Sequence, residues 1–473
     1  MKNLGFLLGL ILIVGVAVDA EAVEFEFHGD MNNRFVVYTD HQDWLNPESD
    51  GTIGNKSVEA TYGELKYRYW FEASDDDGAV KGVYGIEIGG VRWGREGSGK
   101  SQGGSYSGDG VNVETRWAYL DFQTPGIEKE LRWRMGLQSW ALNSFLWEET
   151  ATGMKLYGTP SDLIDFEGAW IRSVDKLATT EDERHLENVD NIFGRVNFNI
   201  NPQLKIGLFG LYSWGDNDPA TAADFAAVDP RTYEYKLFAT DAKSRWYNVG
   251  VDGSWGPGNF FINWDFIYQG GKLDDINFTD TEFSGLSSSG DFDISAWLGH
   301  ADIGYKFGKP KLTYTFWYAS GDDDAGDKDF DGFLSIDVDR TDSMSMFEGG
   351  YADDVTYFTE RPYMLDKGFV MNKLALDYQW TEKLRVGTAA MYMMTAEDIE
   401  YFNNNGGSES NDEIGFELNG YIKYMLYKNM ELALNAGYLW SGDAMDAFEQ
   451  GDDRDGSADE NIFISTARVR WKF

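Results

Sequence analysis

The sequence has no cysteine, only nine prolines and few basic residues. Without cysteine, the chain can form neither disulfide bonds nor thiolate metal sites. Its 40 Lys and Arg residues stand against 80 Asp and Glu, which gives a formal net charge of −40 at pH 7. This balance argues against nucleic acid as a partner, because phosphate binding needs a basic surface.

Long hydrophobic runs are also scarce. Only one uncharged apolar run stands out, from Leu4 to Val18, and it follows Lys2. The next residues, Ala20-Glu21-Ala22, place small side chains at the two positions that a signal peptidase reads. We therefore predict a signal peptide over residues 1–22 and a mature start at Val23, with an N-terminal anchor helix as the alternative. The rest of the chain has no second run of that length, which excludes a helical membrane protein.

What the sequence does have is aromatic residues, at 16 %, and 54 glycines. From Phe25 onward, segments of about ten residues alternate apolar and polar side chains. In one of them, Tyr69 and Phe71 alternate with Arg68 and Glu72. Period two puts the two sets on opposite faces of a β-strand. Each segment taken alone would also fit a soluble β-sandwich.

The connections between these segments alternate in length. The short ones are Ser74–Gly78, Thr124–Lys129, Gly158–Asp162, Asn201–Gln203, Gly256–Asn259, Phe307–Lys311, Thr381–Lys383 and Tyr427–Met430. The long ones lie near residues 40–60, 94–111, 215–243, 271–292, 321–367, 398–412 and 442–460. Short turns at one end and long loops at the other are typical of a transmembrane barrel, with short periplasmic turns and long extracellular loops.

We therefore predict an all-β fold, a transmembrane antiparallel up-and-down β-barrel of about 18 strands. The number becomes 16 if a hairpin within residues 139–200 is a loop folded inward. Residues 23–473 would form this single domain, whose long loops are acidic and whose longest loop is 321–367.

Aromatic residues gather near the ends of the predicted strands on the apolar face. Examples are Tyr84, Trp93, Tyr212, Trp214, Trp255, Tyr268, Trp317, Tyr318, Trp380 and Trp440. This placement favours aromatic girdles at the two lipid interfaces. The alternative is that they are ordinary sheet aromatics, because strands favour such side chains.

The last segment, residues 462–473, alternates Val469, Trp471 and Phe473 with Arg468 and Arg470. An alternating final strand that ends in Phe473 resembles the C-terminal signal of bacterial outer-membrane proteins, which the barrel-assembly machinery reads. Together with the predicted signal peptide, it indicates the bacterial outer membrane, where the partners are lipid and lipopolysaccharide.

Three short stretches carry a resemblance to a known family. They are Ala118-Tyr119-Leu120-Asp121-Phe122 followed by Arg134-Met135-Gly136-Leu137-Gln138, then Tyr318-Ala319-Ser320-Gly321-Asp322-Asp323, and Ala436-Gly437-Tyr438-Leu439-Trp440-Ser441-Gly442-Asp443-Ala444. They resemble a homotrimeric porin family of sulfate-reducing and related bacteria. Similar fragments occur in alginate-export-type channels, which are 18-stranded barrels.

The resemblance implies a homotrimeric porin whose water-filled channel lets small hydrophilic solutes or ions diffuse passively. Two alternatives stay open. One is a substrate-specific outer-membrane channel, for an anionic solute or for polysaccharide export. The other is a barrel that sheathes an electron-transfer partner such as a cytochrome.

Charged residues on the polar face would line the lumen, because they are costly on the lipid face. The candidate pore-lining and selectivity residues are Lys66, Arg68, Lys81, Glu87, Arg132, Arg134, Asp302, Arg385, Arg468 and Arg470. Opposing basic and acidic walls would select solutes by size and charge. The alternative is a ladder of ion pairs that merely solvates the lumen.

The segment Asn143–Glu149 follows a strand that carries Arg132 and Arg134. In many porins a loop at this point folds into the barrel. We therefore hypothesise an eyelet in which these arginines form the basic side and Glu148 and Glu149 face them.

The longest loop contains the run Asp327-Lys328-Asp329-Phe330-Asp331-Gly332, which has the D-x-D-x-D-G spacing of a calcium loop. Val338 stands where that motif has a glutamate. We therefore expect no required cofactor, with Ca²⁺ on Asp327, Asp329 and Asp331 as a candidate site. The alternative is a solvated acidic loop, or one that divalent cations bridge to lipopolysaccharide.

We do not expect an enzyme, because no nucleophile and base stand in a recognisable motif. The chain has four histidines. His300 and Asp302 share one face of a predicted strand, which favours a contribution to lumen polarity.

Overall fold

The computed structural model of the chain describes residues 23–41, 58–75, 77–94, 111, 113–127, 131–174, 189–216, 241–277, 290–324, 327–336, 342–344, 367–448, 455–459 and 461–473. The predicted signal peptide, residues 1–22, lies outside the described residues, as do the central parts of most of the predicted long loops. None of the helices in the described part of the chain is long and apolar enough to cross a membrane.

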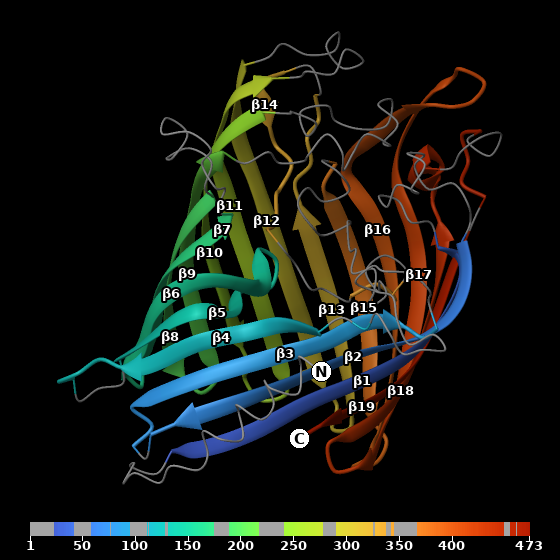
Figure 1. The fold of residues 1–473 in the computed structure, drawn as a ribbon. Helices are drawn as coiled ribbons and strands as arrows, with labels where there is room; N and C mark the ends of the chain where they lie inside the picture. The colour runs from blue at the N-terminus through green and yellow to red at the C-terminus, as the bar shows by residue number, and fades with distance from the viewer. Residues whose placement is uncertain are drawn as a thin grey trace, which may run out of the picture.

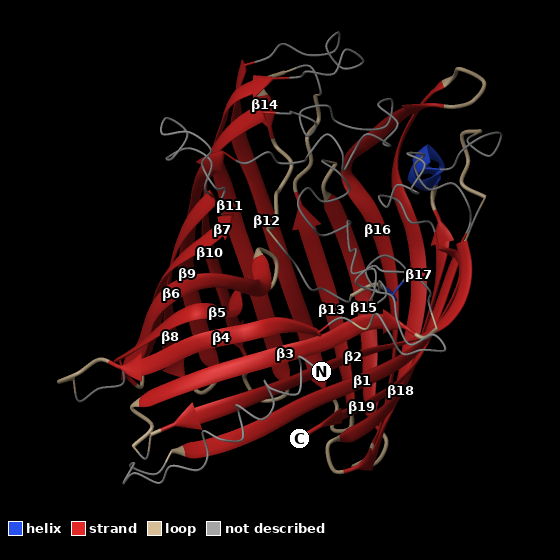
Figure 2. Cartoon of the chain, viewed as in Figure 1, coloured by secondary structure: helices blue, strands red, loops and turns tan. Residues whose placement is uncertain are grey.

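Eighteen antiparallel strands of the described chain form one closed barrel (Figure 1; Figure 2). They are β1 (Glu24–His41), β2 (Val58–Ser74), β3 (Val80–Arg92), β4 (Val113–Gln123), β5 (Leu131–Asn143), β6 (Trp147–Ser161), β7 (Ile164–Val174), β8 (Val189–Asn201), β9 (Leu204–Asp216), β10 (Asp241–Trp255), β11 (Phe260–Asn277), β12 (Gly290–Lys306), β13 (Pro310–Ala319), β15 (Phe369–Gln379), β16 (Leu384–Phe402), β17 (Ser408–Tyr427), β18 (Met430–Ser441) and β19 (Ile462–Lys472). The two-residue strand β14 (Asp329–Phe330) is not one of these eighteen; it belongs to the connection between β13 and β15 and pairs in parallel with β12.

Each of the eighteen strands pairs with the next along the chain, and β1 pairs with β19 to close the ring. The predicted count of 18 strands is confirmed. Residues 139–200 contribute parts of β5 to β8 to the wall, so the alternative of 16 strands is wrong. Closure leaves no sheet edge with unpaired backbone groups, which a strand exposed to hydrocarbon could not tolerate.

The outer face of the barrel is apolar. Phe71 is 48 % exposed, Leu208 is 49 % exposed and Ile422 is 50 % exposed. Many other large hydrophobic side chains share this face with them, around the whole ring. In water such a surface would be unfavourable at roughly 25 cal/mol per Å² of apolar area, so the wall is suited to a lipid environment.

The closing seam ends at Phe473. Its backbone nitrogen donates to the oxygen of Gly29 at 3.0 Å, and its own oxygen accepts from the nitrogen of Gly29 at 2.9 Å. Its ring lies 5.6 Å from that of Phe27 and 4.5 Å from that of Trp471. A side chain at Gly29 would overlap the Phe473 ring, so glycine leaves the space that the last residue fills.

The eight connections that were predicted to be short all join strands at the same end of the barrel. The β17–β18 connection is the two residues Lys428 and Asn429, and Asn429 adopts a positive φ of 61°. Asparagine tolerates this left-handed conformation better than most residues, which suits a tight hairpin.

Two sequence-based expectations need correction. Residues 398–412 form no long loop, because β16 and β17 extend into this region and leave only 403–407 between them. (The β5–β6 connection, residues 144–146, is another short one at the long-loop end, for which no length was predicted.) Trp317 belongs to no lipid-facing girdle: it is fully buried and points inward, while its neighbour Tyr318 points outward. Adjacent residues of a strand cannot share a face.

Candidate functional site

The inner face of the barrel can be traced through residues that stand directly opposite each other on neighbouring strands, because such pairs share a face. Asp252 of β10 stands opposite Asp265 of β11. Asp265 stands opposite His300 of β12, which stands opposite Trp317 of β13. The side chain of Asn143, from β5 on another part of the wall, contacts both Asp252 and Asp265. Such a contact can form only through the lumen.

All ten predicted pore-lining residues lie on this inner face: Lys66, Arg68, Lys81, Glu87, Arg132, Arg134, Asp302, Arg385, Arg468 and Arg470. Nearly all of them take part in ion pairs. The Arg–carboxylate distances include 2.5 Å for Arg68–Glu87, 2.6 Å for Arg132–Asp121, 2.9 Å for Arg385–Asp377, 2.7 Å for Arg468–Glu431 and 2.8 Å for Arg470–Asp30. The inner wall therefore carries a ladder of ion pairs, the arrangement that the sequence analysis gave as the alternative to unpaired selectivity residues.

The balance of charge differs around the wall. On β2 to β4, Glu87 forms ion pairs with three basic side chains: Arg68, Arg116 at 3.1 Å and Lys66 at 3.7 Å. Asp121 of β4 forms ion pairs with both Arg132 and Arg134 of β5. This part of the wall therefore holds more positive than negative charge.

The wall from β10 to β12 has the opposite balance. The inner faces of β10 to β12 carry Asp252, Asp265 and Asp302 against one lysine, Lys306, while Arg195 of β8 and His300 are the basic partners of these carboxylates. His300 Nδ1 is 2.9 Å from Asp265, and its Nε2 is 3.5 Å from Asp302. An ion in the lumen therefore meets a basic wall on one side and an acidic wall on the other.

The tip of the β5–β6 hairpin enters the barrel. In Figure 1 this teal turn lies in the middle of the barrel, below the long-loop rim. The turn is closed locally: the Asn143 side chain accepts from the nitrogen of Phe145 at 2.9 Å, and the Asn143 oxygen accepts from the nitrogen of Leu146 at 3.0 Å. Asparagine commonly starts turns in this way. Its side-chain nitrogen then donates to Asp265 at 2.8 Å and to Asp252 at 3.3 Å.

The turn that follows Asn143 therefore lies inside the barrel, while the predicted eyelet, in which Glu148 and Glu149 face Arg132 and Arg134, stays a prediction. Arg132 and Arg134 are bound to Asp121, and Tyr157 donates to the same carboxylate at 2.5 Å. Their position on β5 keeps them next to β4 and β6, whereas the tip crosses to the far wall.

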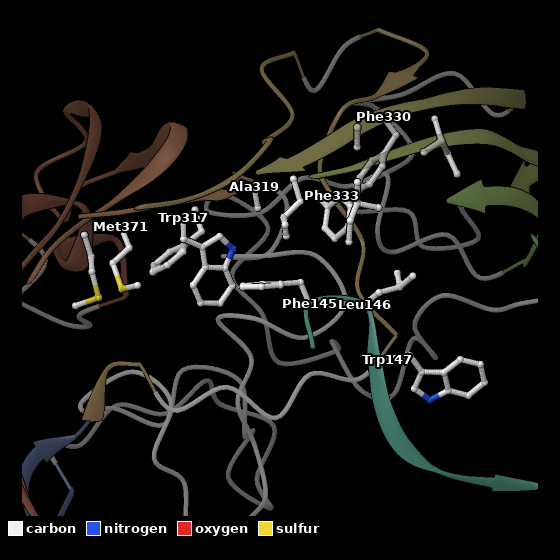
Figure 3. Close-up of a cluster of buried hydrophobic side chains, with 14 of the residues drawn as sticks. Phe145, Leu146, Trp147, Trp317, Ala319, Phe330, Phe333 and Met371 are labelled. Atoms are coloured by element: carbon white, nitrogen blue, oxygen red, sulfur yellow. The ribbon is translucent and has the colours of Figure 1, made fainter. Parts of the chain in front are cut away.

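Apolar side chains fix the tip against that far wall. The Phe145 ring lies 4.6 Å from the His300 ring and 4.9 Å from the Trp317 ring, and Phe145 is fully buried. Figure 3 shows Phe145 and Leu146 next to Trp317 and Phe333. Burial of a side chain of this size contributes roughly 2–3 kcal/mol, so the tip is a firmly seated element.

A second segment, made of residues 320–324 and 327–336 after β13, meets the tip inside the barrel. The nitrogen of Ile336 donates to the oxygen of Leu146 at 2.8 Å. The side chain of Gln269 on β11 donates to the oxygen of Leu334 at 2.9 Å and accepts from its nitrogen at 3.0 Å. The two inward segments share one apolar cluster, to which Phe145, Phe330 and Phe333 belong (Figure 3). Because both segments lie inside the barrel, they occupy part of the lumen.

The same long connection is tied to a third part of the wall. Glu417 of β17 is fully buried and accepts from Ser343 Oγ at 2.5 Å and from the nitrogen of Met344 at 2.9 Å. Lys373 of β15 pairs with Asp342 at 3.0 Å. Gly437 lies where a larger residue would press on Met344. Residues 342–344 therefore lie against β15 to β18.

Below the tip, a cavity of about 340 Å³ opens between β7 and β11, lined by Asp165, Asn197, Lys205 and others. Arg195 is part of this lining: one guanidinium nitrogen lies 2.5 Å from Asp252 and another donates to the oxygen of Leu142 at 3.1 Å. A side chain at Gly207 would overlap both Arg195 and Asp252, so glycine permits this ion pair.

The candidate calcium residues lie at the long-loop end. Asp329 is exposed, and its nitrogen donates to the Asp327 side chain at 3.0 Å. Burial, together with the charges of Asp322 and Asp329, raises the pKa of Asp331 above its usual range. Within the described residues, Asp327, Asp329 and Asp331 do not bring their oxygens within 4.8 Å of one another. Calcium binding here stays a prediction.

No protein-family model matches the chain, and no curated protein matches it by sequence. Solved structures do match it. Pseudomonas aeruginosa OccK8 (OprE) is 10 % identical, with 95 % of this chain and 98 % of that chain covered and a TM-score of 0.52. Acinetobacter baumannii OccAB4 is 11 % identical, with 95 % and 98 % covered and a TM-score of 0.51. Pseudomonas aeruginosa OpdO is 11 % identical, with 95 % and 97 % covered and a TM-score of 0.50. At these identities the likeness is one of fold.

Proposed function

We propose that the chain is a porin of the bacterial outer membrane, a water-filled channel through which small hydrophilic solutes or ions diffuse passively. The observation that supports this most is the contrast between the two faces of the closed barrel. The outer face exposes large apolar side chains such as Phe71 and Leu208, whereas the inner face carries paired charges such as Arg68 and Glu87. Charged groups require water or polar partners, so such an interior is suited to a hydrated lumen.

The inward segments would set the selectivity of this channel. The tip around Phe145 and the segment of residues 320–324 and 327–336 reduce the open cross-section, and the basic and acidic walls lie on either side of it. Solutes would thus be sorted by size at the constriction and oriented by the field across it. We propose no enzymatic role for His300, because Asp265 and Asp302 hold it and Phe145 covers it.

Liposome swelling tests the proposed function. Purified protein reconstituted into liposomes should admit small sugars and amino acids, with a rate that falls as the solute grows. Liposomes with the same protein added after heat unfolding are the control. Swelling by one solute alone would instead indicate a substrate-specific channel. A folded, inserted protein that admits no solute would contradict a porin and would favour a sheath for a partner.

We also propose homotrimeric assembly, on the strength of the family resemblance. The apolar outer wall could supply subunit contacts as well as contacts with lipid. Sedimentation in detergent distinguishes the states, and a particle that contains one chain would reject the trimer.

For the calcium prediction, we expect a calorimetric titration with Ca²⁺ to give saturable heat that Asp329→Ala removes. Asp329 is the central carboxylate of the motif. A matched control is Asp274→Ala on β11, an acidic residue that pairs with Arg245. A flat titration of the unchanged protein would reject the site.

A further inference from the structure

Three side chains with metal-binding atoms meet on the inner face at the short-turn end of the barrel. They are Glu26 and His28 of β1 and Glu72 of β2, and their ligand atoms all lie within 4.8 Å of one another. Within the described residues, no other group of three His, Asp or Glu meets this spacing. Asp30, two residues after His28, pairs with Arg470 of the inner face. Because residues two apart on a strand share a face, His28 and Glu26 also lie on the inner face.

The register brings the two glutamates together. Glu26 stands directly opposite Glu72 in the β1–β2 ladder. Like charges in such a cross-strand pair are unfavourable unless a cation lies between them. Lys81 of β3 pairs with Glu72 at 2.6 Å. Its single positive charge cannot balance both carboxylates, so the group retains a net attraction for a cation.

The imidazole of His28 is already turned toward the carboxylates. Its Nε2 lies 3.2 Å from an oxygen of Glu26. The ring stacks on Trp70 with centroids 5.1 Å apart, and Trp70 packs in turn against Trp117 at 5.4 Å. These contacts hold the nitrogen in place before any ion arrives, which lowers the cost of binding.

We propose that Glu26, His28 and Glu72 bind one divalent transition-metal ion of the Zn²⁺ type. An imidazole nitrogen with carboxylate oxygens is a ligand set that suits Zn²⁺ and Cu²⁺, whereas Ca²⁺ and Mg²⁺ prefer oxygen alone. Ligands at about 2.0–2.2 Å from Zn²⁺ require the three atoms to approach one another to about 3.4 Å. The Glu26 side chain is 58 % exposed and can make this movement, and water completes the coordination.

This proposal does not depend on solute transport, and it is tested by binding alone. Zn²⁺ is titrated calorimetrically into the purified protein in detergent, with excess Ca²⁺ present to occupy sites made only of oxygen. We expect one saturable site per chain. His28→Gln and Glu72→Gln should each weaken it at least about tenfold, because each removes one of three ligands. The control is Glu431→Gln, an inner-face carboxylate that pairs with Arg468 and should leave the affinity unchanged.

Equal Zn²⁺ affinity in the unchanged protein and in His28→Gln would overturn the proposal, as would the absence of a saturable site. Heat-modifiable migration on gels checks that each variant is folded. If His28→Gln does not fold, Cu²⁺ bound to the unchanged protein gives a second measurement. We expect nitrogen hyperfine splitting from one imidazole in its electron paramagnetic resonance spectrum, and a spectrum with oxygen ligands alone would contradict the site.

Discussion

The variant Asn143→Ala/Phe145→Gly should conduct at least about twice as much current per channel as the unchanged protein, because the tip that crosses the lumen is released. Asn143 supplies the polar contacts of the tip with Asp252 and Asp265. Phe145 supplies the apolar contact with Trp317. Replacing the buried Phe145 ring removes about 3–5 kcal/mol of the free energy that holds the tip against the wall. We expect this loss to detach the turn of three residues.

Single-channel recording in planar bilayers measures this effect. The control is Phe307→Gly in the β12–β13 turn, where an aromatic side chain is exposed and lies away from the tip. Its conductance should equal that of the unchanged protein. If the tip variant is folded and conducts no more than the control, the hairpin does not form the constriction.

The second expected result concerns ion selectivity. Arg132→Gln/Arg134→Gln should shift the channel toward cations, and Asp252→Asn/Asp265→Asn should shift it toward anions. The first pair removes positive charge from the basic wall, and the second removes negative charge from the acidic wall. One unit charge about 4 Å from an ion in water is worth about 1 kcal/mol, so we expect permeability ratios to change by about fivefold.

Reversal potentials under a salt gradient measure both shifts. The amide of Asn keeps an oxygen that can accept the hydrogen bond from Asn143, so the second variant should retain the tip in place. Arg245→Gln is the control, because Arg245 lies exposed toward the long-loop rim and pairs with Asp274. Reversal potentials that stay the same in both double variants would show that the paired charges only solvate the lumen.

The barrel itself could be predicted because its pattern is local. Period two along a strand separates Phe71 from Arg68 and Glu72 without any knowledge of neighbouring strands. Alternating connection lengths then gave the strand number. The error at Trp317 arose because two adjacent aromatics, Trp317 and Tyr318, were both assigned to lipid. The pairing register decides between them, because Trp317 stands opposite His300 on the inner face, where it contacts Phe145 and Phe369.

The constriction could be predicted only in part, because its contacts join distant parts of the chain. Asn143 and Asp265 are 122 residues apart. No local pattern pairs them. One signal was present: the run Phe145-Leu146-Trp147 is strongly apolar for the tip of a hairpin, where polar residues are usual. Such a tip needs a buried surface, and the opposite wall provides it.

The most direct test of a water-filled channel is a conductance trace of the unchanged protein in a planar bilayer without added ligand. A closed barrel with a charged, hydrated lumen should give stepwise, ohmic currents in which each step is one insertion event. A protein that inserts in folded form but gives no current above the lipid background would contradict the account.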